Sequence, residues 1–195
     1  KNLIEENDIL QLLFVGRIVR EKGIYELLSA IESLVAGREK VRLTVAGDGP
    51  DLPELIRRND GFQPGTVRFL GFVNGKELET AYRSADLLVF PTYHDEGFPY
   101  VAIEAMRAGM PIISTNSGAL EELVTDGVTG FKVPPRDTDA LVETIRRVIS
   151  HRTLLEEMSR NCHAYFKANL SRSAAERFYA ELIGDASLHG VGRLR

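Results

Sequence analysis

The stretch QLLFVGRIVREKGIYELLSAI, residues 11–31, decides the fold class. It begins with a short apolar run, QLLFVG (11–16), whose length and branched or aromatic composition are typical of a strand. A polar segment bounded by glycines follows, and apolar residues then recur with helical period over 23–36. A strand, a polar loop and a helix in this order form the first part of a β-α-β unit.

The same alternation of short apolar runs and helical patterns continues along most of the chain. The runs are apolar throughout, which is typical of parallel strands covered on both faces. The expected strands span 11–16, 41–47, 67–71, 87–91, 111–115 and 130–134, and the expected helices 23–36, 51–59, 75–84, 99–109, 118–125 and 137–150. The sequence therefore predicts an α/β fold with a Rossmann-like, doubly wound parallel β-sheet and helices on both faces.

The last part of the chain contains no further predicted strand. Residues 152–169 and 171–184 have helical periodicity, so we expect C-terminal helices after the sheet. The expected organisation is a linker or incoming segment at 1–9, one Rossmann-like domain at 10–184 and a flexible tail at 185–195.

Composition limits the classes of partner and compartment. A formal net charge of −4 argues against a general nucleic-acid or anionic-membrane surface. The single cysteine, Cys162, forms no internal disulfide and suits a reducing compartment, so a cytoplasmic location is expected. No apolar run approaches the roughly 20 residues of a membrane-spanning helix. The chain begins with Lys1, so either its start was processed or it is a piece of a longer protein.

Two polar clusters follow the first and fourth predicted strands. In an open parallel sheet, ligands bind beyond the carboxyl ends of the strands, where the strand order reverses. If the order is 3-2-1-4-5-6, the first and fourth strands flank that crevice. The polar clusters are GRIVREKG (16–23) and the segment from Glu96 to Glu104, and this order would bring them together.

The first cluster places three cations, Arg17, Arg20 and Lys22, near a helix N-terminus, where positive charge is unfavourable. An anion would offset this cost, and a phosphate or diphosphate is the natural candidate. Arg17 can bind it bidentately and Lys22 as a point charge. The alternative is a solvated loop whose charges, including Glu21, satisfy one another. Neither the P-loop pattern nor G-x-G-x-x-G is present, so a nucleoside triphosphatase or standard dinucleotide enzyme is not indicated.

The second cluster contains two carboxylates, Glu96 in a loop and Glu104 within the following helix. Pro99 fits the first turn of that helix. The backbone amides predicted to be unpaired at its N-terminus are those of Gly97, Phe98 and Tyr100.

Ionised carboxylates accept hydrogen bonds from vicinal hydroxyls, so this pair suits one ribose and one second sugar around a diphosphate. Three alternatives remain for Glu96 and Glu104: charges that only favour a helix, a pair of acids for glycoside hydrolysis, or metal ligands. For a metal site, His94 and Asp95 adjoin Glu96, but no matching ligand cluster follows elsewhere, so no metal is expected.

Several motifs together resemble the carboxyl-terminal half of retaining GT-B-fold glycosyltransferases of glycosyltransferase family four. The resemblance covers residues 10–168, with all motifs in family order. The motifs are GRIVREKG (16–23), VAGDGP (45–50), VRFLGFV (67–73), ADLLVFPTYHDEGFPYVAIEAMRAGMPIIST (85–115) and SGALEELVTDGVTGFKVPPRD (117–137).

The resemblance implies roles for individual residues. Glu96, Arg17 and Lys22 would be catalytic: Arg17 and Lys22 would bind the diphosphate, and Glu96 would face the transferred sugar. Glu104 would take the ribose hydroxyls. The donor-binding residues that the resemblance implies are Gly16, Arg17, Lys22, Phe72, Val73, Glu96, Gly97, Phe98, Pro99, Tyr100 and Glu104.

The resemblance gives less definite roles to three parts of the chain. Phe72 and Val73 would lie at the nucleobase, although packing at a strand end explains them equally well. The turn GDGP (47–50) would be mainly architectural. Gly118 matches the start of a G-G-x-x-E stretch that ends at Glu122, but Ala119 replaces its second glycine.

The resemblance also implies partners. The expected partners are a nucleotide sugar and a missing N-terminal domain that binds the acceptor; no cofactor or metal is expected. Peripheral membrane contact through the missing half is the alternative to a purely cytoplasmic location. Alone, this chain would bind donor weakly and transfer nothing. The alternative function is a non-catalytic module or subunit that binds a nucleotide or phosphosugar.

Overall fold

The computed structural model describes residues 9–177 and 179–180. Their centre is a six-stranded parallel sheet with the order β3-β2-β1-β4-β5-β6, which confirms the predicted order. The strands are β1 (Leu10–Val15), β2 (Val41–Ala46), β3 (Val67–Gly71), β4 (Leu87–Phe90), β5 (Ile112–Ser114) and β6 (Gly130–Lys132).

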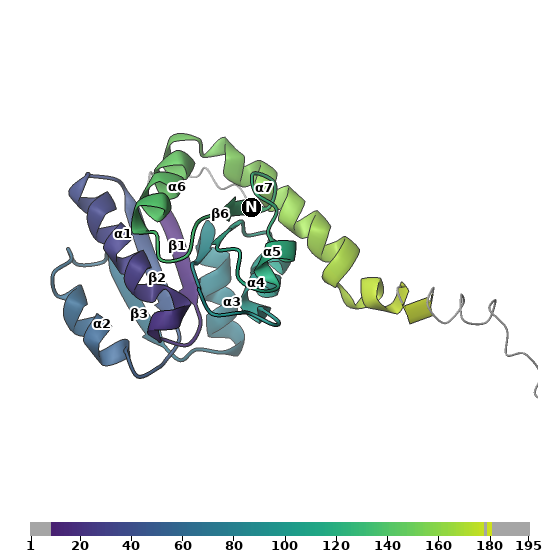
Figure 1. Ribbon diagram of the computed structural model, residues 1–195, viewed down its shortest axis with the longest axis horizontal. Helices are drawn as coiled ribbons and strands as arrows, with labels where there is room; N and C mark the ends of the chain where they lie inside the picture. The colour runs from purple at the N-terminus through teal and green to yellow at the C-terminus, as the bar shows by residue number, and fades with distance from the viewer. Residues whose placement is uncertain (1–8, 178, 181–195) are drawn as a thin grey trace, which may run out of the picture.

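Helices cover both faces of this sheet, so the predicted doubly wound fold is confirmed (Figure 1). One face carries α1 (Ile24–Ala36), α2 (Leu52–Asn59) and α6 (Thr138–Ser150). The other face carries α3 (Gly75–Ser84), α4 (Tyr100–Arg107) and the short α5 (Leu120–Leu123).

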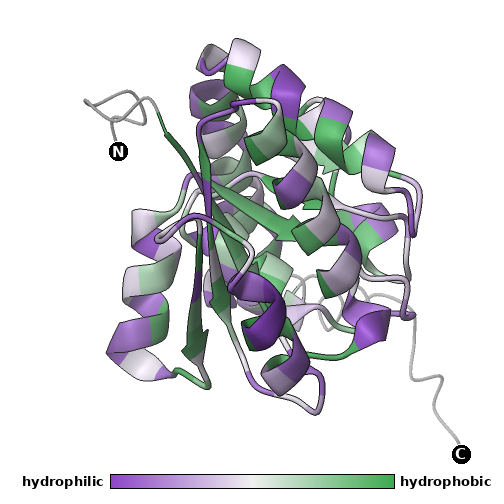
Figure 2. Cartoon of the chain, turned by 90° about the vertical axis from the view of Figure 1, so that its left-hand side faces the viewer, coloured by the Kyte–Doolittle hydropathy of each residue, from purple (hydrophilic) through white to green (hydrophobic). Residues whose placement is uncertain are grey.

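The two central strands form the middle of the core. All of β4 is buried, and β1 is buried except for the partly exposed Gln11. Figure 2 shows these strands as a hydrophobic layer between helices whose outer faces are polar. Burying one leucine side chain stabilises a fold by roughly 1.5–3 kcal/mol, so this double-sided burial explains why the runs are apolar throughout.

The segment after the sheet is helical, as predicted. Helix α7 (Thr153–Tyr165) packs on α4 and continues into a π-helical turn, η2 (Phe166–Leu170). Residues 172–177 and 179–180 are also helical, and Figure 1 shows this arm leaving the body of the domain. The predicted tail at 185–195 and almost all of the predicted linker at 1–9 lie outside the described residues. None of the helices described is long and apolar enough to cross a membrane.

The buried thiol of Cys162 gives the first testable prediction. Burial raises the pKa of this thiol from an ordinary value of 9.0 to about 12. At pH 8 we therefore expect iodoacetamide to modify Cys162 in the folded chain at least about 100-fold more slowly than in the urea-unfolded chain.

The sign of the accompanying pH effect follows from proton binding. Between pH 9.0 and about 12 the unfolded thiol ionises first, so the folded chain holds more protons. The free energy of unfolding should fall as pH rises through this range. For the modification experiment, equal rates in the folded and unfolded chains would contradict the burial of the Cys162 thiol.

Candidate functional site

The loops that follow β1 and β4 meet at the carboxyl edge of the sheet. The Lys22 ammonium lies 2.5 Å from Oε1 of Glu96, and the two side chains retain only 17% and 12% of their exposure. The two residues are separated by 74 positions in the sequence. The two polar clusters therefore lie together at the point where the strand order reverses.

A glycine closes the first of these loops. The loop contains a short 3₁₀ helix, η1 (Arg20–Lys22), and Gly23 ends η1 and begins α1 with a φ of 73°. A Cβ on Gly23 would lie 2.1 Å from the carbonyl oxygen of Pro91, which directly follows β4. Only a residue without a side chain permits this approach, and the approach brings Lys22 to Glu96.

Backbone hydrogen bonds join the same two loops. The carbonyl of Glu21 accepts a hydrogen bond from the amide of Tyr93 at 3.0 Å. The hydroxyl of Thr92 also lies 3.2 Å from this carbonyl. The loop after β1 is therefore tied to the loop after β4 through its backbone as well as through the Lys22 side chain.

Thr92 also contacts the Glu96 carboxylate. Its hydroxyl lies 2.9 Å from Oε1 of Glu96, the same oxygen that Lys22 contacts. Thr92 is fully buried, and its carbonyl accepts a hydrogen bond from the buried hydroxyl of Thr115, which follows β5. The loops after β1 and β4 thus meet at one carboxylate oxygen, and the loop after β5 supports Thr92.

The loop before α5 holds the backbone of Glu96. The amide of Ala119 donates a hydrogen bond to the Glu96 carbonyl at 2.8 Å. Gly118 has a φ of 56°, and a Cβ there would lie 2.4 Å from Oδ1 of Asp95 and 2.5 Å from the Glu96 carbonyl oxygen. The close approach needs glycine at position 118, whereas position 119 accepts an alanine.

The start of α4 differs from the prediction. The helix begins at Tyr100, and Pro99 lies before it with φ −79° and ψ 81°. These angles form an inverse γ-turn, in which the Tyr100 amide donates to the Phe98 carbonyl at 2.9 Å. The prediction that the Tyr100 amide is unpaired is therefore wrong, because the turn centred on Pro99 uses it. Within the described chain, the amides of Gly97 and Phe98 have no hydrogen-bond acceptor.

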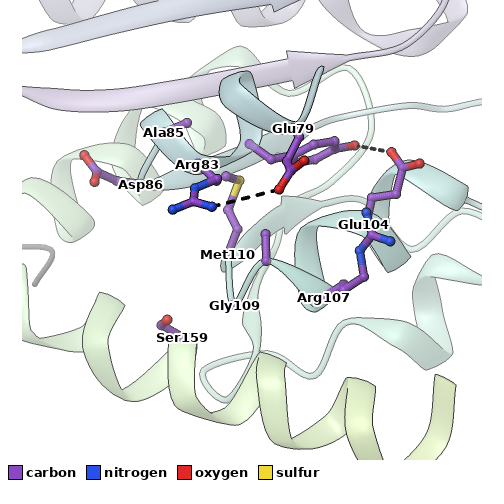
Figure 3. A pocket seen from close by; sticks show the side chains of 11 residues that line it. Glu79, Arg83, Ala85, Asp86, Glu104, Arg107, Gly109, Met110 and Ser159 are labelled. Carbon is purple, nitrogen blue, oxygen red and sulfur yellow. Dashed lines mark hydrogen bonds and ion pairs between the residues drawn. The ribbon is translucent and has the colours of Figure 1, made fainter. Parts of the chain in front are cut away.

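Glu104 points toward α3. The hydroxyl of Tyr82 donates to Oε2 of Glu104 at 2.9 Å, and both side chains line a cavity of about 710 Å³ between α3, α4 and α7 (Figure 3). Tyr82 is only 6% exposed. Burial and the adjacent carboxylate raise the pKa of its phenol above the ordinary value of 10.0, so Tyr82 remains a hydrogen-bond donor. The second carboxylate thus lies between the two helices.

The arginines of the first cluster are arranged differently from each other. Arg17 is exposed, its carbonyl accepts a hydrogen bond from the Val19 amide at 3.0 Å, and its guanidinium has no hydrogen bond or ion pair within the described part of the chain. The guanidinium of Arg20 lies 4.1 Å above the ring of Tyr25 on α1. Cation-π stacking therefore holds Arg20 on the helix.

The remaining predicted donor residues lie around the same edge of the sheet. Gly16 continues β1, and its amide donates to the Ala46 carbonyl at 3.0 Å. Phe72 is 74% exposed, whereas Val73 packs against the core. The aromatic rings of Phe98 and Tyr100 are also exposed and pack edge to face, with centroids 4.8 Å apart.

Two residues of this arrangement were missed by the sequence analysis. Thr92 is the second residue after β4, and its position between a buried strand and Glu96 was an available signal. Tyr82 carried no such signal, because its contact with Glu104 depends on how α3 packs beside α4. Across residues 9–177 and 179–180, no group of three histidine, cysteine or carboxylate side chains could hold a metal ion.

Comparison with known sequences gives the family. The sequence family described as glycosyl transferases group 1 matches residues 1–165, so the chain belongs to this family. It is 37% identical over 148 residues to an uncharacterised glycosyltransferase of Methanocaldococcus jannaschii, covering 74% of this chain and 37% of that protein. It is 36% identical over 142 residues to glycogen synthase of Mycobacterium tuberculosis, covering 71% of this chain and 34% of that enzyme. The chain thus matches less than half of the length of these relatives.

Solved structures match the fold. Anabaena HepE in complex with UDP superimposes with a TM-score of 0.80 at 23% identity, covering 91% of this chain and 49% of that one. The C-terminal domain of LpcC, a group 1 glycosyl transferase family protein of Francisella tularensis, gives a TM-score of 0.74 at 27% identity. That match covers 84% of this chain and 87% of the LpcC domain. The domain therefore has the architecture of one half of a GT-B fold.

Proposed function

We propose that this chain is the donor-binding domain of a retaining glycosyltransferase that transfers a sugar from a nucleoside-diphosphate sugar to an acceptor hydroxyl. The observation that carries this proposal is the meeting of Lys22 and Glu96 at the edge where the strand order reverses. A cation and a carboxylate at this position fit a ligand that has both phosphates and sugar hydroxyls.

The phosphate-binding groups lie on both sides of the crevice. The guanidinium of Arg17 is exposed and has no partner in the described chain, so it is available for bidentate contact with the diphosphate. Lys22 comes from the same loop. The amides of Gly97 and Phe98, which have no acceptor among the described residues, supply further donors from the opposite loop. These donors would stabilise the negative charge that develops on the leaving diphosphate, without a metal ion.

The carboxylates would bind the sugars of the donor. Glu96 lies beside Lys22, so a transferred sugar held by Glu96 would adjoin a diphosphate held by Lys22. Glu104 would accept hydrogen bonds from the ribose hydroxyls. Lys22 and Glu96 contact each other in this structure. On donor binding, Lys22 would instead contact the diphosphate and Glu96 the transferred sugar.

Transfer would also need a second wall. The acceptor hydroxyl must be held against the anomeric carbon while water is excluded. We assign this role to an N-terminal domain that binds the acceptor. The support is that the shared region is only 37% and 34% of the length of the two matched relatives. The UDP bound by HepE supports a nucleoside-diphosphate sugar as the donor class.

The test is calorimetric titration of the chain with UDP, GDP, ADP and their common sugar derivatives. For the tightest ligand, Arg17→Ala should lower affinity roughly 10-fold to 100-fold, since a hydrogen bond to a charged group contributes about 1.5–3 kcal/mol. Arg57→Ala is the control, because Arg57 is also exposed and lies on α2, away from this edge. Absence of binding to every nucleotide, or equal affinity in the Arg17 and Arg57 variants, would contradict the proposal.

A further inference from the structure

Glu96 and Glu104 are held in a similar way. In each, one carboxylate oxygen is held by the hydroxyl of a buried residue, while the other oxygen has no hydrogen-bond or ion-pair partner within residues 9–177 and 179–180. For Glu96 the held oxygen is Oε1, and for Glu104 it is Oε2.

We infer that Thr92 and Tyr82 are positioning residues that fix the rotamers of Glu96 and Glu104, so that Oε2 of Glu96 and Oε1 of Glu104 are the oxygens that receive sugar hydroxyls. This inference rests on the proposed function for its ligand. The positioning itself is a property of the unliganded chain.

The contacts of Thr92 show why it acts on Glu96. Its hydroxyl has one proton and two acceptors within reach, Oε1 of Glu96 at 2.9 Å and the Glu21 carbonyl at 3.2 Å. The proton goes to the carboxylate, which is nearer and charged. The His94 amide donates to the same hydroxyl at 3.2 Å and fixes its direction. Lys22 contacts the same carboxylate oxygen, so the second oxygen is left for a ligand.

The contacts of Tyr82 lead to the same conclusion for Glu104. Its hydroxyl lies 2.9 Å from Oε2 of Glu104 and 3.3 Å from the Val101 carbonyl. The nearer, charged acceptor takes the proton. Because Tyr82 is 6% exposed and held between helices, it can fix the direction of a carboxylate that is itself only partly buried. Glu104 would otherwise rotate toward the open cavity beside it (Figure 3).

The chain contains matched controls for both hydroxyls. Tyr25 donates to Oε2 of Glu54 at 3.0 Å on the opposite face of the sheet, so Tyr25→Phe removes a similar Tyr–Glu bond and keeps the ring on which Arg20 stacks. Thr129 is 2% exposed and accepts a hydrogen bond from the Thr125 amide, so Thr129→Val removes a buried hydroxyl elsewhere.

The first experiment is crystallography of the unliganded chain. In Tyr82→Phe we expect Glu104 in more than one rotamer, and in Thr92→Val we expect the same of Glu96. Thr92→Ser should restore the single rotamer of Glu96. Single, unchanged rotamers in both hydroxyl-deleted variants would overturn the inference without reference to any ligand.

The second experiment compares the affinities of UDP, GDP and ADP with those of their 2′-deoxy forms. Tyr82→Phe should lower the affinity for the ribonucleotide roughly 3-fold to 10-fold. It should change the affinity for the deoxyribonucleotide by less than about twofold. Glu104→Gln should also lower the ratio of ribonucleotide affinity to deoxyribonucleotide affinity. Tyr25→Phe should leave this ratio unchanged.

A corresponding result is expected for Thr92. A nucleotide sugar such as UDP-glucose, UDP-N-acetylglucosamine or GDP-mannose should bind more tightly than its free nucleoside diphosphate, because Glu96 binds the sugar. Thr92→Val should reduce this gain in affinity. Thr92→Ser should restore that gain, and Thr129→Val should leave it unchanged.

The outcomes separate this inference from the proposed function. If Glu104→Gln lowers the ribose preference and Tyr82→Phe does not, the positioning role is wrong and the proposed function stands. If the wild-type chain binds no nucleoside diphosphate, the proposed function is wrong, and the rotamers of the unliganded variants still decide the positioning roles.

Discussion

Replacing Gly23 with alanine should lower the free energy of unfolding by about 3 kcal/mol, since a left-handed backbone costs about 1–2 kcal/mol and overpacking about 1–3 kcal/mol. The backbone at Gly23 has a φ of 73°. A Cβ there would lie 2.1 Å from the carbonyl oxygen and 2.7 Å from the carbonyl carbon of Pro91. These atoms belong to the backbone, so relief requires that the two loops separate. Urea denaturation followed by circular dichroism measures the loss.

Gly127 is the matched control for this substitution. It also has a φ of 73°, but a Cβ there meets no atom within 4 Å. Gly127→Ala should therefore cost only about 1 kcal/mol, from backbone conformation alone. Because Gly23 brings Lys22 to Glu96, under the proposed function the Gly23 variant should also lose nucleotide affinity, and the Gly127 variant should not. Equal stability losses in the two variants would show that the contact with Pro91 has no energetic role.

Replacing Lys22 with methionine should produce the other large effect. The side chains of Lys22 and Glu96 are 17% and 12% exposed, so the substitution leaves a carboxylate mostly out of water with only the Thr92 hydroxyl beside it. Removing one partner of a largely buried pair costs about 3 kcal/mol. Under the proposed function, nucleoside-diphosphate affinity should also fall roughly 10-fold to 100-fold, because a charge-assisted phosphate contact is lost.

A double-mutant cycle distinguishes this pair from an ordinary surface pair. Lys22→Met combined with Glu96→Gln should recover part of the lost stability, because the uncompensated charge is removed. Arg172→Met is the control: Arg172 and Glu176 are 2.8 Å apart but 93% and 63% exposed. The control should stay within about 0.5 kcal/mol of the wild type in free energy of unfolding. If the effects of the Lys22 and Glu96 substitutions on the free energy of unfolding are additive, the contact between the two side chains does not stabilise the fold.

The sheet was predictable because its central strands carry an unambiguous pattern. β1 and β4 are buried on both faces, and such strands appear in the sequence as continuous apolar runs bounded by glycine or proline. Helices between consecutive runs require parallel strands, and right-handed connections then limit the possible orders. The convergence of Lys22 and Glu96 followed from this order, without knowledge of either side chain's direction.

The details that the sequence did not specify depend on single rotatable bonds and on turns. The sequence shows that Arg20 lies in a cationic loop, but not that its side chain stacks on Tyr25 one helical turn later. Pro99 fits either the first helical position or the residue before it, and ψ decides between them. This angle determines whether the Tyr100 amide is free. Local patterns do not specify such angles.

The contact of Tyr82 with Glu104 could not be predicted for a different reason. Each residue lies on its own amphipathic helix, and the periodicity of α3 and α4 shows only which side faces the sheet. Which residue of α3 meets which residue of α4 depends on the lateral packing of two helices over one sheet. The sequence therefore indicated both acids but not the hydroxyl that orients the second one.

The pairing of β1 with β4 also has a kinetic consequence. Leu12 lies beside Leu87, so the central pair of strands closes a loop that contains β2, β3 and three helices. Such non-local pairing gives the domain a high contact order, which slows folding. Neither half of the crevice exists in a chain whose central strands are apart. Under the proposed function, nucleotide would bind only after these strands have paired, and it would slow unfolding without speeding the approach to the folded state.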